Sequence, residues 1–210
     1  MRNISIITDS SSDLPVDFIN REEIKVISQN YSFDDGVEYG EEHPMPMAEF
    51  YERMRRGEAA KTSASSPDAA MQIIQKELSK GNDVICITLS SKLSCTYNNI
   101  RLASLEVCEA YPDQKIAVID SLSASVGEGL LIYQACAMRK NGKSFSDIVM
   151  YLEKYRQTYQ MEFYVNELKY LVRGGRLSAA AGAIGGIMGI KPILRLTEEG
   201  TIEVACKARK

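Results

Sequence analysis

Hydroxyl side chains are concentrated in four short segments, and each follows a run of residues that is typical of a β-strand. The segments are Thr8–Asp13, Thr62–Pro67, Ser90–Thr96 and Asp120–Ser125. In an open α/β sheet, ligands bind beyond the carboxyl ends of the strands. Hydroxyl groups gathered there can donate hydrogen bonds to an anion without carrying a positive charge. The pattern therefore predicts a site for a small anionic ligand.

Serine and threonine also cap helices and form turns, and this is the simpler explanation for any one segment. Ser66, directly before Pro67, is typical of a helix N-cap. Four such segments, each after a strand-like run, favour a shared site.

The elements that must position these segments alternate regularly over the first 160 residues. Apolar runs at 4–7, 24–33, 84–89 and 116–119 predict strands, and helical spacing predicts helices near 15–20, 47–56, 67–80, 96–110, 127–139 and 148–159. Asp13 and Ser66 are the expected N-caps of two of these helices, and Ser144–Asp147 has the spacing of a capping box. This alternation predicts an α/β fold with a mainly parallel, Rossmann-like sheet and flanking helices, in a domain spanning residues 1–160.

From residue 161 onward the pattern changes. A short strand at 163–165, a helical turn at 168–172, a helix of small residues at 178–189 and a hairpin of strands at 192–196 and 201–205 are expected. They predict a smaller, second α/β domain with antiparallel strands over residues 161–210. The small residues of 178–189 indicate either close packing on a neighbouring element or room for a long apolar ligand.

Composition narrows the class of protein. Hydrophobic residues make up 45% and charged residues 25% of the chain, and the net charge is −3. This is ordinary for a globular protein and argues against a nucleic-acid partner, which usually requires a basic face. Five cysteines without C-x-x-C spacing indicate reduced thiols in the cytoplasm. No apolar run approaches the roughly 20 residues that span a bilayer, and the N-terminus has no signal pattern.

Common enzyme signatures are missing from the sequence. A Ser-His-Asp triad would have to use the single histidine, His43, but the sequence has no G-x-S-x-G motif for the nucleophile. It also has no Walker A motif and no zinc-ligand spacing. Asp9 resembles the start of a phosphoaspartate motif, but Ser11 stands where that motif has its second aspartate. We therefore expect no catalytic residue, no metal and no cofactor.

Arg173 and Arg176, which flank two glycines, are either solvated loop charges or contacts for a phosphate or an acidic partner.

Taken together, these motifs resemble the DegV family of bacterial fatty-acid-binding proteins. The matching segments, in family order along the chain, are Ile7–Pro15, Lys61–Pro67, Ser90–Tyr97, Val118–Ser125, Leu171–Leu177 and Ile190–Leu194. No single segment is specific, whereas the ordered set is. The resemblance implies two α/β domains with a long-chain fatty acid in the cleft between them.

The resemblance also implies residue roles. Thr62 and Ser94 would bind the fatty acid carboxylate, and Ser63, Ser91, Thr96 and Ser121 are additional candidates for the ligand site. Arg173 and Arg176 would contact the partner or the phosphate. That partner would be a separate ATP-binding subunit of a fatty acid kinase, which makes an acyl phosphate for phospholipid synthesis. Two alternatives stay open: a hydrolase or phosphotransferase using Ser94 or Asp9, and a sensor of small anions.

Two features depart from the family pattern. Cys95 stands where the family usually has glycine, so its side chain is expected to crowd the carboxylate site. Family members are also about a third longer, with a histidine-bearing loop near the carboxylate in the additional part. The second domain is therefore expected to be incomplete in this chain, which places lipid binding in question.

Overall fold

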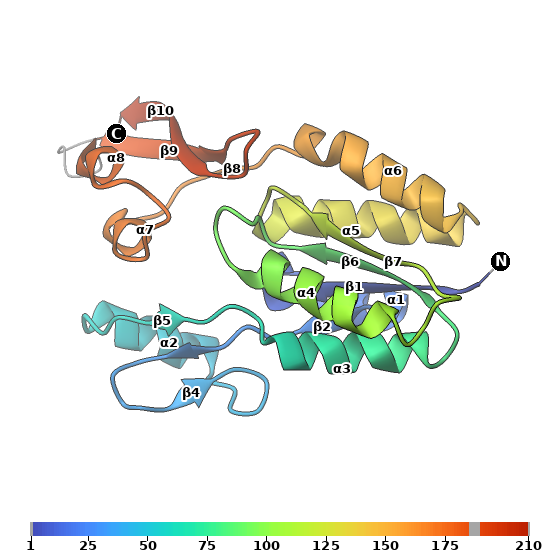
Figure 1. The fold of residues 1–210 in the computed structure, drawn as a ribbon. Helices are drawn as coiled ribbons and strands as arrows, with labels where there is room; N and C mark the ends of the chain where they lie inside the picture. Colours follow the sequence, from blue (N-terminus) through green and yellow to red (C-terminus); the bar gives the residue numbers. More distant parts are fainter. Residues whose placement is uncertain (1, 185–189, 210) are drawn as a thin grey trace.

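The computed structural model describes residues 2–184 and 190–209. Its centre is a four-stranded sheet in the order β2-β1-β6-β7 (Figure 1). The strands are β1 (Ile4–Asp9), β2 (Lys25–Ile27), β6 (Asp83–Thr88) and β7 (Ile116–Asp120), and each neighbouring pair is parallel. The carboxyl ends of all four strands therefore lie at one edge of the sheet. The predicted α/β fold with a parallel sheet is confirmed.

Helices cover both faces of this sheet, because neighbouring side chains of each strand point to opposite faces. Ile6 and Ile85 pack in a core with α1 (Val16–Glu22), α5 (Ser125–Lys140) and α6 (Phe145–Tyr155). Ile7 and Val84 pack in a second core with α3 (Pro67–Leu78) and α4 (Thr96–Cys108). All residues of β1 and β6 are buried, which explains their continuous apolar sequences.

A second, antiparallel sheet lies beyond the carboxyl edge, in the order β4-β3-β5. Its strands are β3 (Tyr31–Ser32), β4 (Glu38–Tyr39) and β5 (Lys61–Thr62), and α2 (Met47–Arg55) accompanies them. An aromatic cluster of Tyr31, Phe33 and Phe50 holds this part together, with the Arg53 guanidinium 4.0 Å from the Phe33 ring centre.

This small sheet corrects two predictions. The expected strand at 24–33 is broken into β2 and β3, which belong to different sheets, because the chain leaves the parallel sheet at Ser28. The Thr62–Pro67 segment does not follow an apolar strand. It begins at Thr62, the last residue of β5, and both residues of that short strand are exposed.

A third sheet, in the order β10-β9-β8, forms in the C-terminal segment (Figure 1). The segment contains the strands β8 (Glu162–Phe163), β9 (Ile190–Leu196) and β10 (Ile202–Arg209), and the helices α7 (Lys169–Arg173) and α8 (Ala179–Ile184). Leu168, Leu177 and Leu194 form its buried core. The predicted antiparallel hairpin is confirmed, while the division of the chain into two domains at residue 160 stays a prediction.

Helix boundaries differ from the predictions at several places. The helix predicted at 148–159 spans Phe145–Tyr155 and is followed by the 3-10 turn η2 (Arg156–Thr158). The first helix begins at Val16 with no side-chain cap, because Asp13 has a left-handed φ of 50° and ends the 3-10 turn η1 (Ser10–Ser12). The small-residue helix is described only as α8, and residues 185–189 of the predicted helix lie outside the described residues. In α8, a Cβ atom at Gly182 would lie 2.3 Å from Val172 Cγ2, so close packing accounts for this glycine. The N-cap at Ser66 and the capping box at Ser144 are confirmed.

Glu128 joins α5 to the end of β1 and is fully buried. Its Oε1 accepts a hydrogen bond from Thr8 Oγ1 at 3.0 Å, and its Oε2 lies 3.2 Å from Ser11 Oγ. The neighbouring Gly129 permits this approach, since a Cβ atom there would lie 3.0 Å from the carbonyl oxygen of Ser12. Burial, and to a lesser extent the charge of Asp9, raise the pKa of Glu128 well above its usual range.

The raised pKa makes the stability of the fold depend on pH. The folded state binds the Glu128 proton more tightly than the unfolded state, so the free energy of unfolding falls as pH rises above the ordinary value of 4.5. Glu128→Gln can accept from Thr8 and donate to Ser11 as the protonated acid does. We expect it to remove a slope of up to about 1.4 kcal/mol per pH unit in urea unfolding. The same slope in variant and wild type would show that Glu128 is ionised in the fold.

Candidate functional site

Asp9, the last residue of β1, connects the segments that follow three strands of the parallel sheet. Its Oδ1 accepts hydrogen bonds from the Ser11 amide (3.0 Å), the Ser11 hydroxyl (2.5 Å) and Gln29 Nε2 (3.1 Å). Its Oδ2 accepts from the amide of Leu89 at 2.9 Å. Burial raises the pKa of Asp9, and the hydrogen bonds from Ser11 and Leu89 oppose that rise. This buried carboxyl group fixes the geometry of the carboxyl edge.

Thr96 continues this network toward the predicted carboxylate site. Its hydroxyl accepts hydrogen bonds from Gln29 Nε2 and from the amide of Ser65, each at 3.2 Å. It lies 2.9 Å from the hydroxyl of Ser94, which also accepts from the Thr96 amide at 3.1 Å. Two of the predicted site residues, Ser94 and Thr96, are therefore in direct contact.

Thr62 and Ser63 lie at the start of the segment that leads to Ser65. Thr62 is exposed on β5 and pairs with Tyr31, while the Ser63 amide and hydroxyl both donate to the carbonyl oxygen of Asn30, at 2.9 and 3.2 Å. Ser65 then contacts Thr96 through its amide, and Asn99 Nδ2 donates to the carbonyl oxygen of Ser65 at 2.9 Å. The structure thus joins the Thr62–Pro67 segment to the Ser90–Thr96 segment through Ser65.

Ser91 and Ser121 have different surroundings. The Ser91 amide donates to Asp120 Oδ1 at 3.1 Å, which ties the segments after β6 and β7 together. Ser121 is fully buried, and its hydroxyl donates to the carbonyl oxygen of Ser123 at 3.1 Å. The single hydroxyl hydrogen of Ser121 is therefore directed into its own turn, and not toward the Ser94 hydroxyl.

Arg173 and Arg176 are both exposed, but only Arg176 contacts the Ser90–Thr96 segment. Its Nε donates to the carbonyl oxygen of Leu93 at 2.9 Å, next to Ser94. Arg173 is at the end of α7, with its guanidinium carbon 5.8 Å from the Tyr170 ring centre. Arg176 thus stabilises the segment that carries Ser94. Arg173, three residues earlier in the chain, has its side chain exposed to solvent.

Cys95 fits its position without backbone strain. It precedes α4 with φ −74° and ψ −4°, and its side chain is exposed. Because this φ is negative, glycine is not required there. The expected crowding of the Ser94 site by a side chain at this position is therefore not forced by the backbone.

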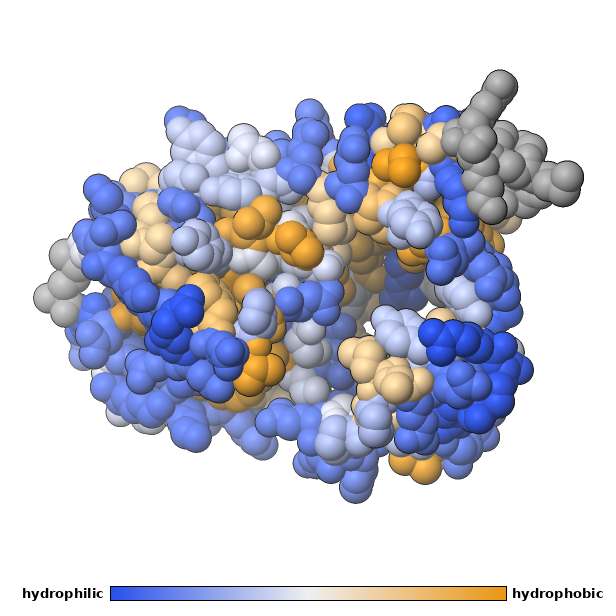
Figure 2. Space-filling model, turned by 180° about the vertical axis from the view of Figure 1, so that it is seen from behind, coloured by the Kyte–Doolittle hydropathy of each residue, from blue (hydrophilic) through white to orange (hydrophobic). Residues whose placement is uncertain are grey.

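A hollow separates the C-terminal segment from α2 and the small sheet. The space-filling view shows it from behind, with both hydrophobic and hydrophilic residues around it (Figure 2). One hydrogen bond joins its two sides, from the hydroxyl of Tyr170 in α7 to the carbonyl oxygen of Met54 in α2 at 3.4 Å. Arg176, from the C-terminal segment, donates to the carbonyl oxygen of Leu93, and the Ser65 amide, in the segment after β5, donates to the Thr96 hydroxyl. Both segments are therefore joined to the chain between Leu93 and Thr96.

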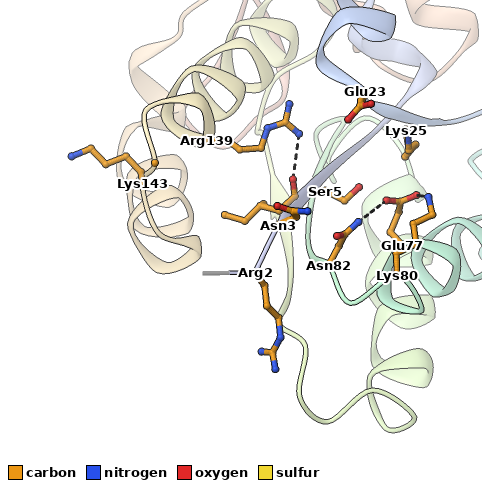
Figure 3. Close-up of a pocket in the computed structure, with 12 residues that line it drawn as sticks. Arg2, Asn3, Ser5, Glu23, Lys25, Glu77, Lys80, Asn82, Arg139 and Lys143 are labelled. Atoms are coloured by element: carbon orange, nitrogen blue, oxygen red, sulfur yellow. Dashed lines mark hydrogen bonds and ion pairs between the residues drawn. The ribbon is translucent and has the colours of Figure 1, made fainter.

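A different pocket, of about 530 Å³, lies at the opposite, amino edge of the sheet (Figure 3). Its lining is almost entirely polar, with Ile4 as its one large apolar residue. Several of its charged groups have partners within the protein: Lys80 pairs with Glu77 at 2.5 Å, and Arg139 donates to the carbonyl oxygen of Ile4 at 3.3 Å. This pocket offers no apolar wall for a long hydrocarbon chain.

The geometry disfavours the two candidate nucleophiles. Asp9 is fully buried and both its oxygens accept hydrogen bonds, so neither is presented to a ligand. Ser94 has Thr96 as its hydroxyl partner rather than a histidine, and His43 is exposed in the loop after β4.

Within residues 2–184 and 190–209, no three His, Cys, Asp or Glu side chains are grouped to hold a metal ion. None of the helices in this described part is long and apolar enough to span a membrane.

Gln29, Ser65 and Glu128 belong to the network but were missed in the sequence. Gln29 follows the end of β2, so its place at the carboxyl edge was a usable signal. Glu128 is an acid between two glycines in an apolar helix, which is an unusual surrounding for a buried charge. Ser65 is indistinguishable in sequence from its neighbouring serines.

Comparison with known proteins gives one consistent family. A family model described as "Uncharacterised protein, DegV family" matches residues 3–210. A DegV domain-containing protein of Clostridium acetobutylicum is 35% identical over 210 residues, covering 100% of this chain and 73% of the relative. The chain thus spans about three quarters of the length of this relative.

Solved structures agree with this assignment. A stearic-acid-binding protein from Eubacterium ventriosum superposes with a TM-score of 0.90 at 30% identity, covering 100% of this chain and 71% of that protein. The fatty acid kinase B3 protein of Streptococcus pneumoniae, loaded with linoleic acid, has a TM-score of 0.84 at 27% identity, covering 99% of this chain and 73% of that protein. On the match over residues 3–210, the chain belongs to the DegV family.

Proposed function

We propose that this protein binds a long-chain fatty acid in the hollow and presents its carboxylate to a separate, ATP-dependent fatty acid kinase subunit. The observation that carries the proposal is the meeting of the Thr62–Pro67 and Ser90–Thr96 segments through a hydrogen bond from the Ser65 amide to the Thr96 hydroxyl. The resemblance of the fold to proteins that bind stearic acid and linoleic acid supports it.

Hydrophobic burial supplies the affinity in this proposal. At roughly 0.8 kcal/mol per buried methylene, a chain of about 15 methylenes contributes on the order of 12 kcal/mol before the cost of association. A few polar contacts then decide only where the carboxylate lies. Thr62 and Ser94 are the proposed contacts, with Ser63, Ser91 and Thr96 near them.

The chemistry of these donors suits a carrier. Neutral hydroxyl groups orient a carboxylate without forming an ion pair, which leaves an oxygen free to attack the terminal phosphate of ATP on another protein. The new bond is between the carboxylate oxygen and that phosphorus, and ADP leaves. In this role the chain itself needs no catalytic residue, metal or cofactor, and it acts in the cytoplasm, where ATP is available.

Two alternatives predict different behaviour. A hydrolase or phosphotransferase using Ser94 or Asp9 would turn over an acyl or phosphate ester without a second protein. A sensor would bind its ligand but give no acyl phosphate when the kinase subunit and ATP are added.

Removing a proposed carboxylate donor should weaken binding of the fatty acid. Ser94→Ala and Thr62→Ala each delete one hydroxyl that would donate to a charged group, so we expect Kd to rise by about 10- to 100-fold in calorimetric titration with oleate. Ser79→Ala is the matched control, because Ser79 is an exposed hydroxyl residue at the far end of α3. Equal affinities in Ser94→Ala and Ser79→Ala would place the carboxylate elsewhere.

Transfer of the phosphate should depend on the arginines of the C-terminal segment. Replacing Arg173 and Arg176 together by alanine should slow acyl phosphate formation by the kinase subunit about tenfold or more, with a much smaller loss of bound lipid from the lost contact between Arg176 and Leu93. Lys169→Ala is the matched control, since Lys169 is an exposed cation at the start of the same helix and pairs with Glu167. Equal loss of transfer and of lipid retention would show that the arginines serve the lipid site, and not the partner.

A further inference from the structure

We infer that Asp9 and Gln29 are positioning residues that hold the Ser94 hydroxyl as a hydrogen-bond donor toward the ligand, so that the site selects an ionised carboxylate over an uncharged headgroup. The inference rests on the proposed function and adds to it the origin of headgroup selectivity. It is carried by the direction of each hydrogen bond between Asp9 and Ser94.

The hydrogen bonds of the Gln29 side chain are the first whose donor and acceptor are fixed. Its Nε2 lies 3.1 Å from Asp9 Oδ1 and 3.2 Å from Thr96 Oγ1. An ionised carboxylate can only accept hydrogen bonds, so Asp9 requires the amino group of Gln29 on this side. The second hydrogen of that amino group then points to Thr96. Asp9 thus makes Gln29 a donor to Thr96.

Thr96 transmits this direction because its acceptor positions are filled. A hydroxyl oxygen has two lone pairs and one hydrogen. The two lone pairs of Thr96 accept from Gln29 Nε2 and from the Ser65 amide, each at 3.2 Å. Its hydrogen is therefore left for the Ser94 hydroxyl oxygen, 2.9 Å away.

Ser94 is then a donor to the ligand for the same reason. Its oxygen accepts from the Thr96 hydroxyl at 2.9 Å and from the Thr96 amide at 3.1 Å. Both lone pairs are occupied, and its own hydrogen has no partner among these contacts. The Ser94 side chain is only partly buried, so this hydrogen can reach a ligand.

Ser11 and Glu128 keep Asp9 in its accepting form. Ser11 has one hydroxyl hydrogen but lies 2.5 Å from Asp9 Oδ1 and 3.2 Å from Glu128 Oε2. A protonated Glu128 donating to Ser11 Oγ lets Ser11 donate to Asp9, which satisfies all three groups. Asp9 also accepts from the Ser11 amide, Gln29 and Leu89, whereas Glu128, among the described residues, accepts otherwise only from Thr8, so the proton belongs on Glu128 and the negative charge on Asp9.

This arrangement distinguishes headgroups that have the same hydrocarbon chain. A carboxylate accepts the Ser94 hydrogen with a charge-assisted bond, whereas an alcohol accepts it with a weaker, neutral bond and cannot donate its own hydrogen to Ser94. The substrate class selected is therefore a long-chain carboxylic acid in its ionised form.

The test compares oleate with oleyl alcohol, by calorimetric titration of the whole chain at a pH where the free acid is ionised in solution. Asp9→Asn keeps the shape but removes the charge that strengthens the hydrogen bond from the amino group of Gln29 and holds that group toward Asp9 and Thr96. Gln29→Met removes the amide altogether. Ser79→Ala is again the matched control, because Ser79 is an exposed hydroxyl residue at the far end of α3 and its hydroxyl donates to the carbonyl oxygen of Lys76 in the same helix.

We expect the preference for oleate over oleyl alcohol to fall about tenfold or more in Asp9→Asn and Gln29→Met, while the affinity for the alcohol stays the same and Ser79→Ala keeps the wild-type preference. An unchanged preference in both variants, with a reduced one in Ser94→Ala, would overturn the inference but keep the proposed function. A wild-type chain that binds neither ligand, or a Ser94→Ala variant that behaves as wild type, would overturn the proposed carboxylate site and the inference with it.

Discussion

The carboxyl group of Asp9 is the constraint on which the carboxyl edge of this structure depends. Parallel strands end together, and the segments that leave them have polar backbone groups that must find partners. One buried carboxylate accepts from the segments after β1, β2 and β6, through Ser11, Gln29 and Leu89. Because its charge is buried, losing any of these donors is costly. The position of Ser94 is set by this requirement.

Much of the fold was predictable because its signals are local. The continuous apolar runs of β1 and β6, the Ser66 cap and the capping box at Ser144 all follow from near-neighbour chemistry. The split of 24–33 was not predictable in this way. It depends on Tyr31 pairing with Thr62, which is distant in sequence, as well as with Tyr39.

The site was predicted in part for a similar reason. Hydroxyl-rich segments at strand ends indicated Ser94 and Thr96, and the structure places them in contact. The sequence could not show which serine of the Thr62–Pro67 segment meets Thr96, since Ser63, Ser65 and Ser66 have the same chemistry. Nor could it show that Ser121 turns inward or that Arg176 braces Leu93, because both depend on tertiary contacts.

Native mass spectrometry of the purified chain, followed by organic extraction and identification of any bound lipid, tests the central claim most directly. The proposed function predicts one long-chain fatty acid per chain, released on denaturation. A chain that carries no lipid, and takes up none when incubated with oleate, would contradict it.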